Sequence, residues 1–199
     1  MRCLRYLPLP LSLISLLLPT LAAAEPWVED KVFFTESAKL GSSMVDAADL
    51  DGDGWIDLVF ANGGGYDKGD MLSDLPQQAF KNLGGTGTMD ISADIFAGAN
   101  SFNGRAVKIR DIDRDGDNDI MLGVTWQKQS QLFINSDGQG TFVNETDSNL
   151  PQLDASIGDL ELGDVDGDGD LDMVLANWGA DVPVGDPVLS EGGTTLLWL

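Results

Sequence analysis

Short apolar runs separated by turn residues recur along most of the chain. Residues 105–110 alternate between polar and apolar side chains, with Val107 and Ile109 on one face, which predicts a half-buried strand. Three other runs are continuously apolar and short, as in strands buried on both faces. They are residues 58–61, 120–124 and 173–176. Because no segment shows helical periodicity, the pattern predicts an all-β protein.

A predicted β-hairpin occurs twice at a fixed distance. Residues 131–135 and 141–145 form strand-like runs around a glycine-containing turn, and glycine supplies the positive φ angles that such turns need. The same pattern begins 53 residues earlier, at Gln78. Two short acidic segments, beginning at Asp111 and Asp164, are also 53 residues apart. The chain therefore contains a repeat, and each unit is expected to hold four strands.

The acidic segments share one nine-residue pattern, with aspartate at positions 1, 3, 5 and 9 and glycine at position 6. The copies begin at Asp49, Asp111 and Asp164. Four carboxylates in nine residues repel one another unless a cation lies among them. Ca²⁺ prefers six to eight oxygen ligands, and the glycine allows a turn that brings the position-7 carbonyl towards the ion. We therefore expect three Ca²⁺ sites.

Two other kinds of loop share part of this pattern. An EF-hand also has carboxylates at positions 1, 3 and 5, but it needs glutamate at position 12 and flanking helices. Position 12 here is Phe60, Leu122 or Leu175, each inside an apolar run. Simple Asp- and Gly-rich turns are the other alternative, yet a turn does not require aspartate at four fixed positions. Both are less satisfactory than a calcium loop within a β-hairpin.

The first 24 residues have the features of a secretory signal peptide. Arg2 and Arg5 precede a leucine-rich stretch, and an Ala-rich segment ends at Ala24. The apolar run is too short for a membrane anchor and contains prolines. We expect cleavage after Ala24, export to the periplasm or medium, and no membrane insertion afterwards. The only cysteine, Cys3, would be lost with this peptide.

Charge further limits the partners. The chain has 33 acidic residues against 11 basic ones, a formal net charge of −22. Fourteen of the acidic residues lie inside the three loops. Such a surface is unsuited to nucleic acid and to anionic membranes. The expected partner is a protein or a carbohydrate.

The acidic loop, the apolar strand after it and the segment Leu-Phe-Ile-Asn-Ser-Asp-Gly-Gln-Gly-Thr-Phe resemble the FG-GAP/VCBS repeat of integrin-α-like β-propellers. The resemblance covers residues 31–199. It implies four-stranded antiparallel blades, each with Ca²⁺ in the hairpin between its first two strands. The implied side-chain ligands are Asp49, Asp51, Asp53, Asp57, Asp111, Asp113, Asp115, Asp119, Asp164, Asp166, Asp168 and Asp172. The implied main-chain oxygens belong to Trp55, Asp117 and Asp170.

The repeat divides residues 25–199 into about three blades. The approximate units are residues 35–90, 91–145 and an incomplete 146–199, and residues 31–36 resemble the last strand of a preceding blade. Propellers close with four to eight blades, so the sequence is expected to be a fragment of a propeller or part of an oligomeric one. Longer connections follow Asn62 and Asn177. They are either partner-binding loops or solvated surface loops.

We interpret the protein as a secreted calcium-binding module for adhesion or recognition, not an enzyme. The absence of histidine removes the commonest general base. The alternative is a propeller enzyme such as a Ca²⁺-dependent polysaccharide lyase, or a non-catalytic part of a larger secreted enzyme. Lys108, Arg105 and Arg110 form the basic cluster that a lyase could use, although a solvated strand face explains them more simply. Trp55, Trp126 and Trp178 are expected to be packing residues and not a sugar-stacking platform.

Overall fold

A computed structural model describes residues 40–63, 74–98, 101–126, 128–179 and 193–199. All of them belong to one compact unit, Lys31–Leu199. The predicted signal peptide, the predicted strand at residues 31–36 and most of the connections after Asn62 and Asn177 lie outside the described residues. The proposed signal-peptide and blade boundaries therefore stay predictions.

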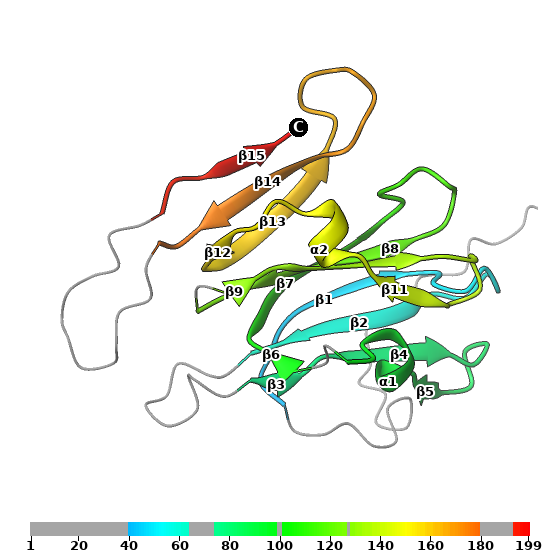
Figure 1. Ribbon diagram of the computed structural model, residues 1–199. Coiled ribbons are helices and arrows are strands. Elements are labelled where there is room, and N and C mark those ends of the chain that lie inside the picture. Colours follow the sequence, from blue (N-terminus) through cyan, green and yellow to red (C-terminus); the bar gives the residue numbers. More distant parts are fainter. Residues whose placement is uncertain (1–39, 64–73, 99–100, 127, 180–192) are drawn as a thin grey trace, which may run out of the picture. The chain divides into compact units, whose positions relative to one another are not determined.

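Three antiparallel sheets follow one another along the chain, and each is a meander (Figure 1). The first contains β1 (Ser42–Ala48), β2 (Asp57–Asn62), β4 (Gln78–Asn82) and β5 (Thr88–Asp90). The second contains β7 (Gly104–Arg110), β8 (Asp119–Val124), β10 (Gln131–Asn135) and β11 (Phe142–Asn144). The third contains β13 (Ile157–Gly163), β14 (Asp172–Asn177) and β15 (Leu196–Trp198). The all-β prediction is confirmed, and the sheets correspond to partial propeller blades.

The structure adds small elements that the sequence pattern did not indicate. Two short strand pairs join the blades at their connections: β3 (Leu75–Pro76) with β6 (Ser101–Phe102), and β9 (Lys128–Gln129) with β12 (Asp154–Ala155). A single helical turn follows the outer strand of the first two blades: α1 (Ser92–Ile95) and α2 (Thr146–Asn149). Four residues are too few to show a helical period. No helix in the described part of the chain is long and apolar enough to span a membrane.

A hydroxyl group anchors each of these helical turns to the third strand of its blade. The Ser92 hydroxyl accepts a hydrogen bond from the Ala79 amide at 2.9 Å. In the next blade, the Thr146 hydroxyl accepts one from the Leu132 amide at 3.0 Å. The two turns are thus equivalent parts of the repeat, although they differ in sequence.

The core consists of two apolar layers, one on each side of the second sheet. In the first layer Val59 and Ala79 pack with Val107, Ile109 and other residues of the second sheet. In the other layer, side chains such as Met121 and Leu132 of the second sheet pack against side chains such as Leu160 and Leu175 of the third. All six residues of β8 are buried, and for residues 120–124 the continuous apolar run predicted this burial.

A register shift lies near the start of the first strand in every blade. The three shifts occur between Ser42 and Met44, between Gly104 and Ala106, and between Ile157 and Asp159. In the second blade the shift places Ala106 and Val107 both in the interior. The simple alternation expected for residues 105–110 therefore holds only after the bulge.

Lys108 departs from the expected solvated strand face. Its side chain is 18% exposed, and its ammonium forms an ion pair with Glu161 of the third blade at 2.9 Å. β7 contacts β13 directly, so a side chain that faces outward from its own sheet faces the neighbouring blade. Arg110 remains largely solvated, with its side chain 48% exposed.

Candidate metal centres

The three acidic loops join the first and second strands of successive blades, at equivalent places in the repeat. They connect β1 with β2, β7 with β8, and β13 with β14. In the first two loops the aspartates at positions 1, 3 and 5 place carboxylate oxygens within 4.8 Å of one another; they are Asp49, Asp51, Asp53, Asp111, Asp113 and Asp115. In the third loop the corresponding group is Asp164, Asp166 and Asp172. Position 5 of that loop, Asp168, is not part of it.

The carboxylate at position 1 organises each loop through backbone amides. In the first loop Asp49 accepts hydrogen bonds from Gly52 and Gly54, both at 2.8 Å. Asp164 accepts the equivalent bonds in the third loop, at 2.7 and 3.0 Å. Positions 4 and 6 adopt left-handed backbone conformations, with φ of 72° at Gly52 and 85° at Gly54. The chain thus wraps around the carboxylate at position 1.

The carboxylate at position 9 has a different environment. Asp57 is 1% exposed and Asp119 is fully buried. Asp119 accepts hydrogen bonds from the amide of Ile112 at 2.8 Å and from the amide of Asn135 at 2.9 Å. It therefore ties the loop to the third strand of its own blade. Burial raises the pKa of Asp119, and the two backbone hydrogen bonds oppose that shift.

The same two hydrogen bonds recur at Asp57, and one of them recurs at Asp172. Asp57 accepts from the amides of Leu50 and Asn82, and Asp172 accepts from the amide of Val165. Burial also raises the pKa of Asp57. Only in the third loop does the position-9 carboxylate join the aspartates that approach one another. Asp57 and Asp119 are not among the aspartates grouped in their loops, and a role for them as metal ligands stays a prediction.

The residues at position 7 make side-chain contacts that the repeat pattern did not predict. The Trp55 ring is 49% exposed and covers the turn glycines Gly84 and Gly85, in agreement with a packing role. The Asp117 carboxylate lies against Gly138, where it occupies the space that a Cβ would need. Asp170 forms an ion pair with Arg114. A role for the main-chain oxygens of these three residues as metal ligands stays a prediction.

The second loop contains a buried acceptor that suits a cation. Among the described residues, Asp111 Oδ1 is one of two buried side-chain oxygens without a hydrogen-bond partner. Desolvation and the nearby carboxylates of Asp115 and Asp111 raise the pKa of Asp117. The donors around this position are all oxygens, the ligand type that Ca²⁺ prefers. The residues present therefore fit a hard divalent cation.

The first loop differs because a lysine already contacts its carboxylates. The Lys81 ammonium forms an ion pair with Asp51 and lies 3.1 Å from Asp53 Oδ2. Hydrogen bonds to these two carboxylates raise the pKa of Lys81. This residue comes from β4, the third strand of the blade. Sequence spacing alone did not identify it.

The loops also contact the neighbouring blade. Asn118 and Asn135 of the second blade donate to the carbonyls of Asp49 and Leu50 in the first loop, each at 2.9 Å. Arg114 of the second loop contacts Asp170 and the Gly169 carbonyl in the third. The acidic ends of the blades are therefore linked to one another.

Comparison with known proteins relates part of this chain to a protein family. Residues 111–175 match the model of the family described as FG-GAP-like repeat. The match starts at the first aspartate of the second loop and extends through the third loop into β14. This part of the chain is an FG-GAP-like repeat. A search of curated proteins found no match to it.

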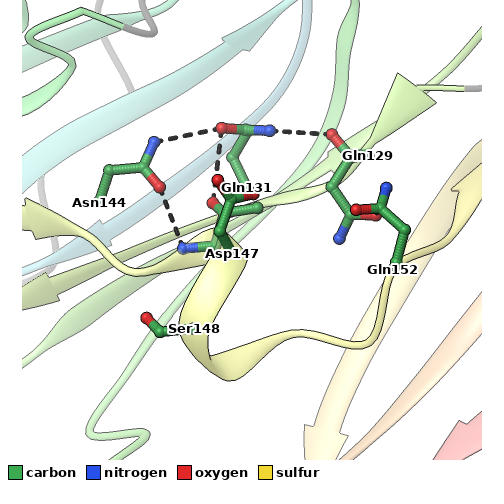
Figure 2. Close-up of a pocket in the computed structure, with 7 residues that line it drawn as sticks. Gln129, Gln131, Asn144, Asp147, Ser148 and Gln152 are labelled. Atoms are coloured by element: carbon green, nitrogen blue, oxygen red, sulfur yellow. Dashed lines mark hydrogen bonds between the residues drawn. The ribbon is translucent and has the colours of Figure 1, made fainter.

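The second blade also carries a polar pocket of about 370 Å³ (Figure 2). It is lined by four side-chain amides, two hydroxyls and one carboxylate, from Gln129, Gln131, Asn144, Gln152, Thr146, Ser148 and Asp147. Gln131 is held in place, since it accepts from Asn144 at 3.2 Å and donates to the Gln129 carbonyl at 3.0 Å. The lining offers many hydrogen-bonding groups and no basic side chain. Such chemistry suits a neutral, hydroxyl-rich ligand.

Proposed function

We propose that this FG-GAP repeat protein is a secreted recognition module whose blades are stabilised by Ca²⁺ and which has no catalytic role. FG-GAP repeats are generally non-catalytic recognition modules and are often calcium-binding, which supports this function. The loops supply three groups of oxygen ligands at equivalent places in successive blades. The observation that carries the proposal is the unpartnered, buried Asp111 Oδ1 beside the carboxylates of Asp113 and Asp115.

Different aspartates of each loop would have different roles when a metal ion is bound. In the first two loops, aspartates at positions 1, 3 and 5 would hold the ion, while position 9 anchors the loop to the third strand. In the third loop the ligands would come from positions 1, 3 and 9. A bound divalent cation supplies positive charge that neutralises the clustered carboxylates. The two strands joined by the loop are then held at a fixed separation. Calcium in this interpretation stabilises the blade and takes no part in a reaction.

The first prediction concerns removal of calcium. Saturation of one site at roughly 100–1,000 times its Kd stabilises the folded state by about 3–4 kcal/mol. We expect a large rise in melting temperature when Ca²⁺ is added to chelated protein, measured by circular dichroism, and a smaller rise with Mg²⁺. A melting curve that is the same with Ca²⁺ and with chelator would contradict the proposed function.

The partner is proposed from the polar pocket of the second blade. Its amides and hydroxyls favour a carbohydrate, and its Asp147 carboxylate disfavours an acidic one. Binding to a panel of neutral and acidic oligosaccharides can be measured with the calcium-loaded protein and with the Asp147→Ala variant. The exposed Asp94 of α1 provides a matched control through Asp94→Ala. Binding that is unaffected by Asp147→Ala would place recognition elsewhere, for example on a protein-binding loop.

Secretion has its own test. The leader predicted at residues 1–24 should be removed when the full sequence is expressed in a cell with a secretory pathway. N-terminal sequencing of the exported protein should then begin at Glu25. Retention of Met1 in a cell-associated product would contradict export.

The alternative of a lyase that uses the basic cluster is less well supported by the structure. The Lys108 ammonium is paired with Glu161, and the Arg105 guanidinium lies 4.8 Å from the centre of the Trp178 ring. Arg110 lies beside Asp46. These three groups form contacts between blades, which accounts for them without a catalytic role.

A further inference from the structure

We propose that Lys81 is a built-in counter-cation of the first loop, which a divalent metal ion must displace. The first loop would then bind Ca²⁺ more weakly than the same loop without its lysine. This inference rests on the proposed calcium binding and adds a difference between sites that the shared nine-residue pattern does not contain.

The contacts of Lys81 carry the first step. Its ammonium forms an ion pair with Asp51 and lies 3.1 Å from Asp53 Oδ2. These residues occupy positions 3 and 5 of the loop, two of the three positions whose oxygens approach one another. Ca²⁺ binds its oxygen ligands at about 2.3–2.6 Å. An ion held by both carboxylates would therefore compete with the ammonium for the same oxygens.

The repeat shows that this lysine is peculiar to the first blade. Phe80 pairs with Leu58 in the first sheet, as Phe133 pairs with Ile120 in the second. The residue after each phenylalanine occupies the equivalent position, and Ile134 therefore corresponds to Lys81. Ile134 is 6% exposed and packs in the apolar layer next to the third sheet. The second loop thus has no positive charge from this position.

The third blade gives the same contrast. Trp198 pairs with Met173, in the register of Phe80 and Leu58. The next residue, Leu199, corresponds to Lys81 and also has no charged side chain. Of the three described blades, only the first therefore places a cation at this point of the strand.

The carboxylates of the first and second loops differ in whether a lysine lies beside them. In the first loop Lys81 neutralises part of the carboxylate charge. In the second, the equivalent carboxylates of Asp113 and Asp115 form no ion pair with the described residues. Since a tethered ammonium repels a divalent ion and occupies its ligands, we expect the lysine to weaken calcium binding to the first loop by about tenfold.

The test compares wild-type protein with Lys81→Met, which keeps an unbranched side chain one atom shorter and removes its charge. Lys81→Gln is a second variant that retains polarity. Lys128 forms an ion pair with Asp74 outside the loops, at 2.7 Å, so Lys128→Met is the matched control. Calcium binding is measured by isothermal titration calorimetry on protein from which bound metal and chelator have been removed. We expect both Lys81 variants to strengthen one of the binding steps by about tenfold, and Lys128→Met to leave all steps unchanged.

Amine labelling with mass spectrometry provides a second measurement on the unmodified sequence. Lys81 should be protected in chelator and become several-fold more reactive when Ca²⁺ is added. Lys128 should keep a constant reactivity and serve as the internal reference. Displacement of the ammonium is thereby observed directly, independently of the affinity.

The outcomes separate this inference from the calcium function itself. Calcium binding that is equally strong in wild-type protein and in both Lys81 variants would overturn the role of Lys81 and leave the calcium function intact. Labelling of Lys81 that does not respond to Ca²⁺ would do the same. A complete absence of calcium binding in all variants would overturn both.

Discussion

Asp113 and Asp119 belong to the same acidic loop, yet the structure gives them different surroundings. Asp113 is exposed and lies with Asp111 and Asp115 in a group of mutually repelling carboxylates. Asp119 is buried and accepts two backbone hydrogen bonds from Ile112 and Asn135. The comparison shows that one residue type, repeated in one motif, can serve both as a proposed metal ligand and as a structural tie.

The largest effect is expected from Asp119→Ala. This change removes the acceptor of two amides in a buried region, and each hydrogen bond to a charged group contributes about 1.5–3 kcal/mol. We expect a loss of about 4 kcal/mol in the free energy of unfolding, measured by denaturant titration, both with Ca²⁺ and with chelator. The exposed Asp94→Ala serves as the control. If Asp119→Ala destabilises only the calcium-loaded protein, Asp119 acts chiefly as a ligand and the contrast with Asp113 is lost.

Asp113→Asn should have a smaller effect that depends on the metal. In chelator the variant should be as stable as wild type, because a repelling charge has been removed and no buried hydrogen bond is lost. With excess Ca²⁺ it should lack up to about 3 kcal/mol of the stabilisation that a saturated site contributes. Comparing denaturant titrations in the two conditions measures this difference. Equal destabilisation in both would mean that Asp113, like Asp119, is a structural tie.

Arg114→Gly is expected to have the smallest effect. Arg114 adopts a φ of 68° at a position where the other loops have glycine, and such a conformation costs roughly 1 kcal/mol for a residue with a Cβ. Its ion pair with Asp170 is solvated, with side chains 49% and 64% exposed, and such pairs contribute about 0–1 kcal/mol. Relief of strain and loss of the pair should nearly cancel, within about 0.5 kcal/mol by thermal unfolding. A larger loss would show that the pair between loops stabilises the blades.

Most of the fold could be predicted because its signals are local. The apolar runs, the glycines of the turns and the 53-residue spacing each lie within a short stretch, and the observed strands follow them closely. The bulge near Arg105 could not be predicted, since it depends on how β7 pairs with β8. The environment of Lys108 also follows from the neighbouring blade, which a single strand pattern does not describe.

Prediction of the candidate site from the sequence is limited in the same way, by contacts with other strands. The aspartates were identifiable from their spacing, and the FG-GAP-like match to residues 111–175 confirms the suspected family. Their separate surroundings were not identifiable, because the amide that binds Asp119 Oδ1 comes from Asn135, on another strand. Lys81 lies 30 residues from the carboxylate that it contacts. A pattern of nine residues cannot contain such a partner.

The hydrogen bond from the Asn135 side chain to the Leu50 carbonyl joins residues 85 positions apart. Because a ribosome makes the chain from its N-terminus, Leu50 emerges long before Asn135 does. The contacts of the first acidic loop are therefore complete only after the second blade has been made. The second loop in turn gains its contacts with Gly169 and Asp170 only when the third loop has been made.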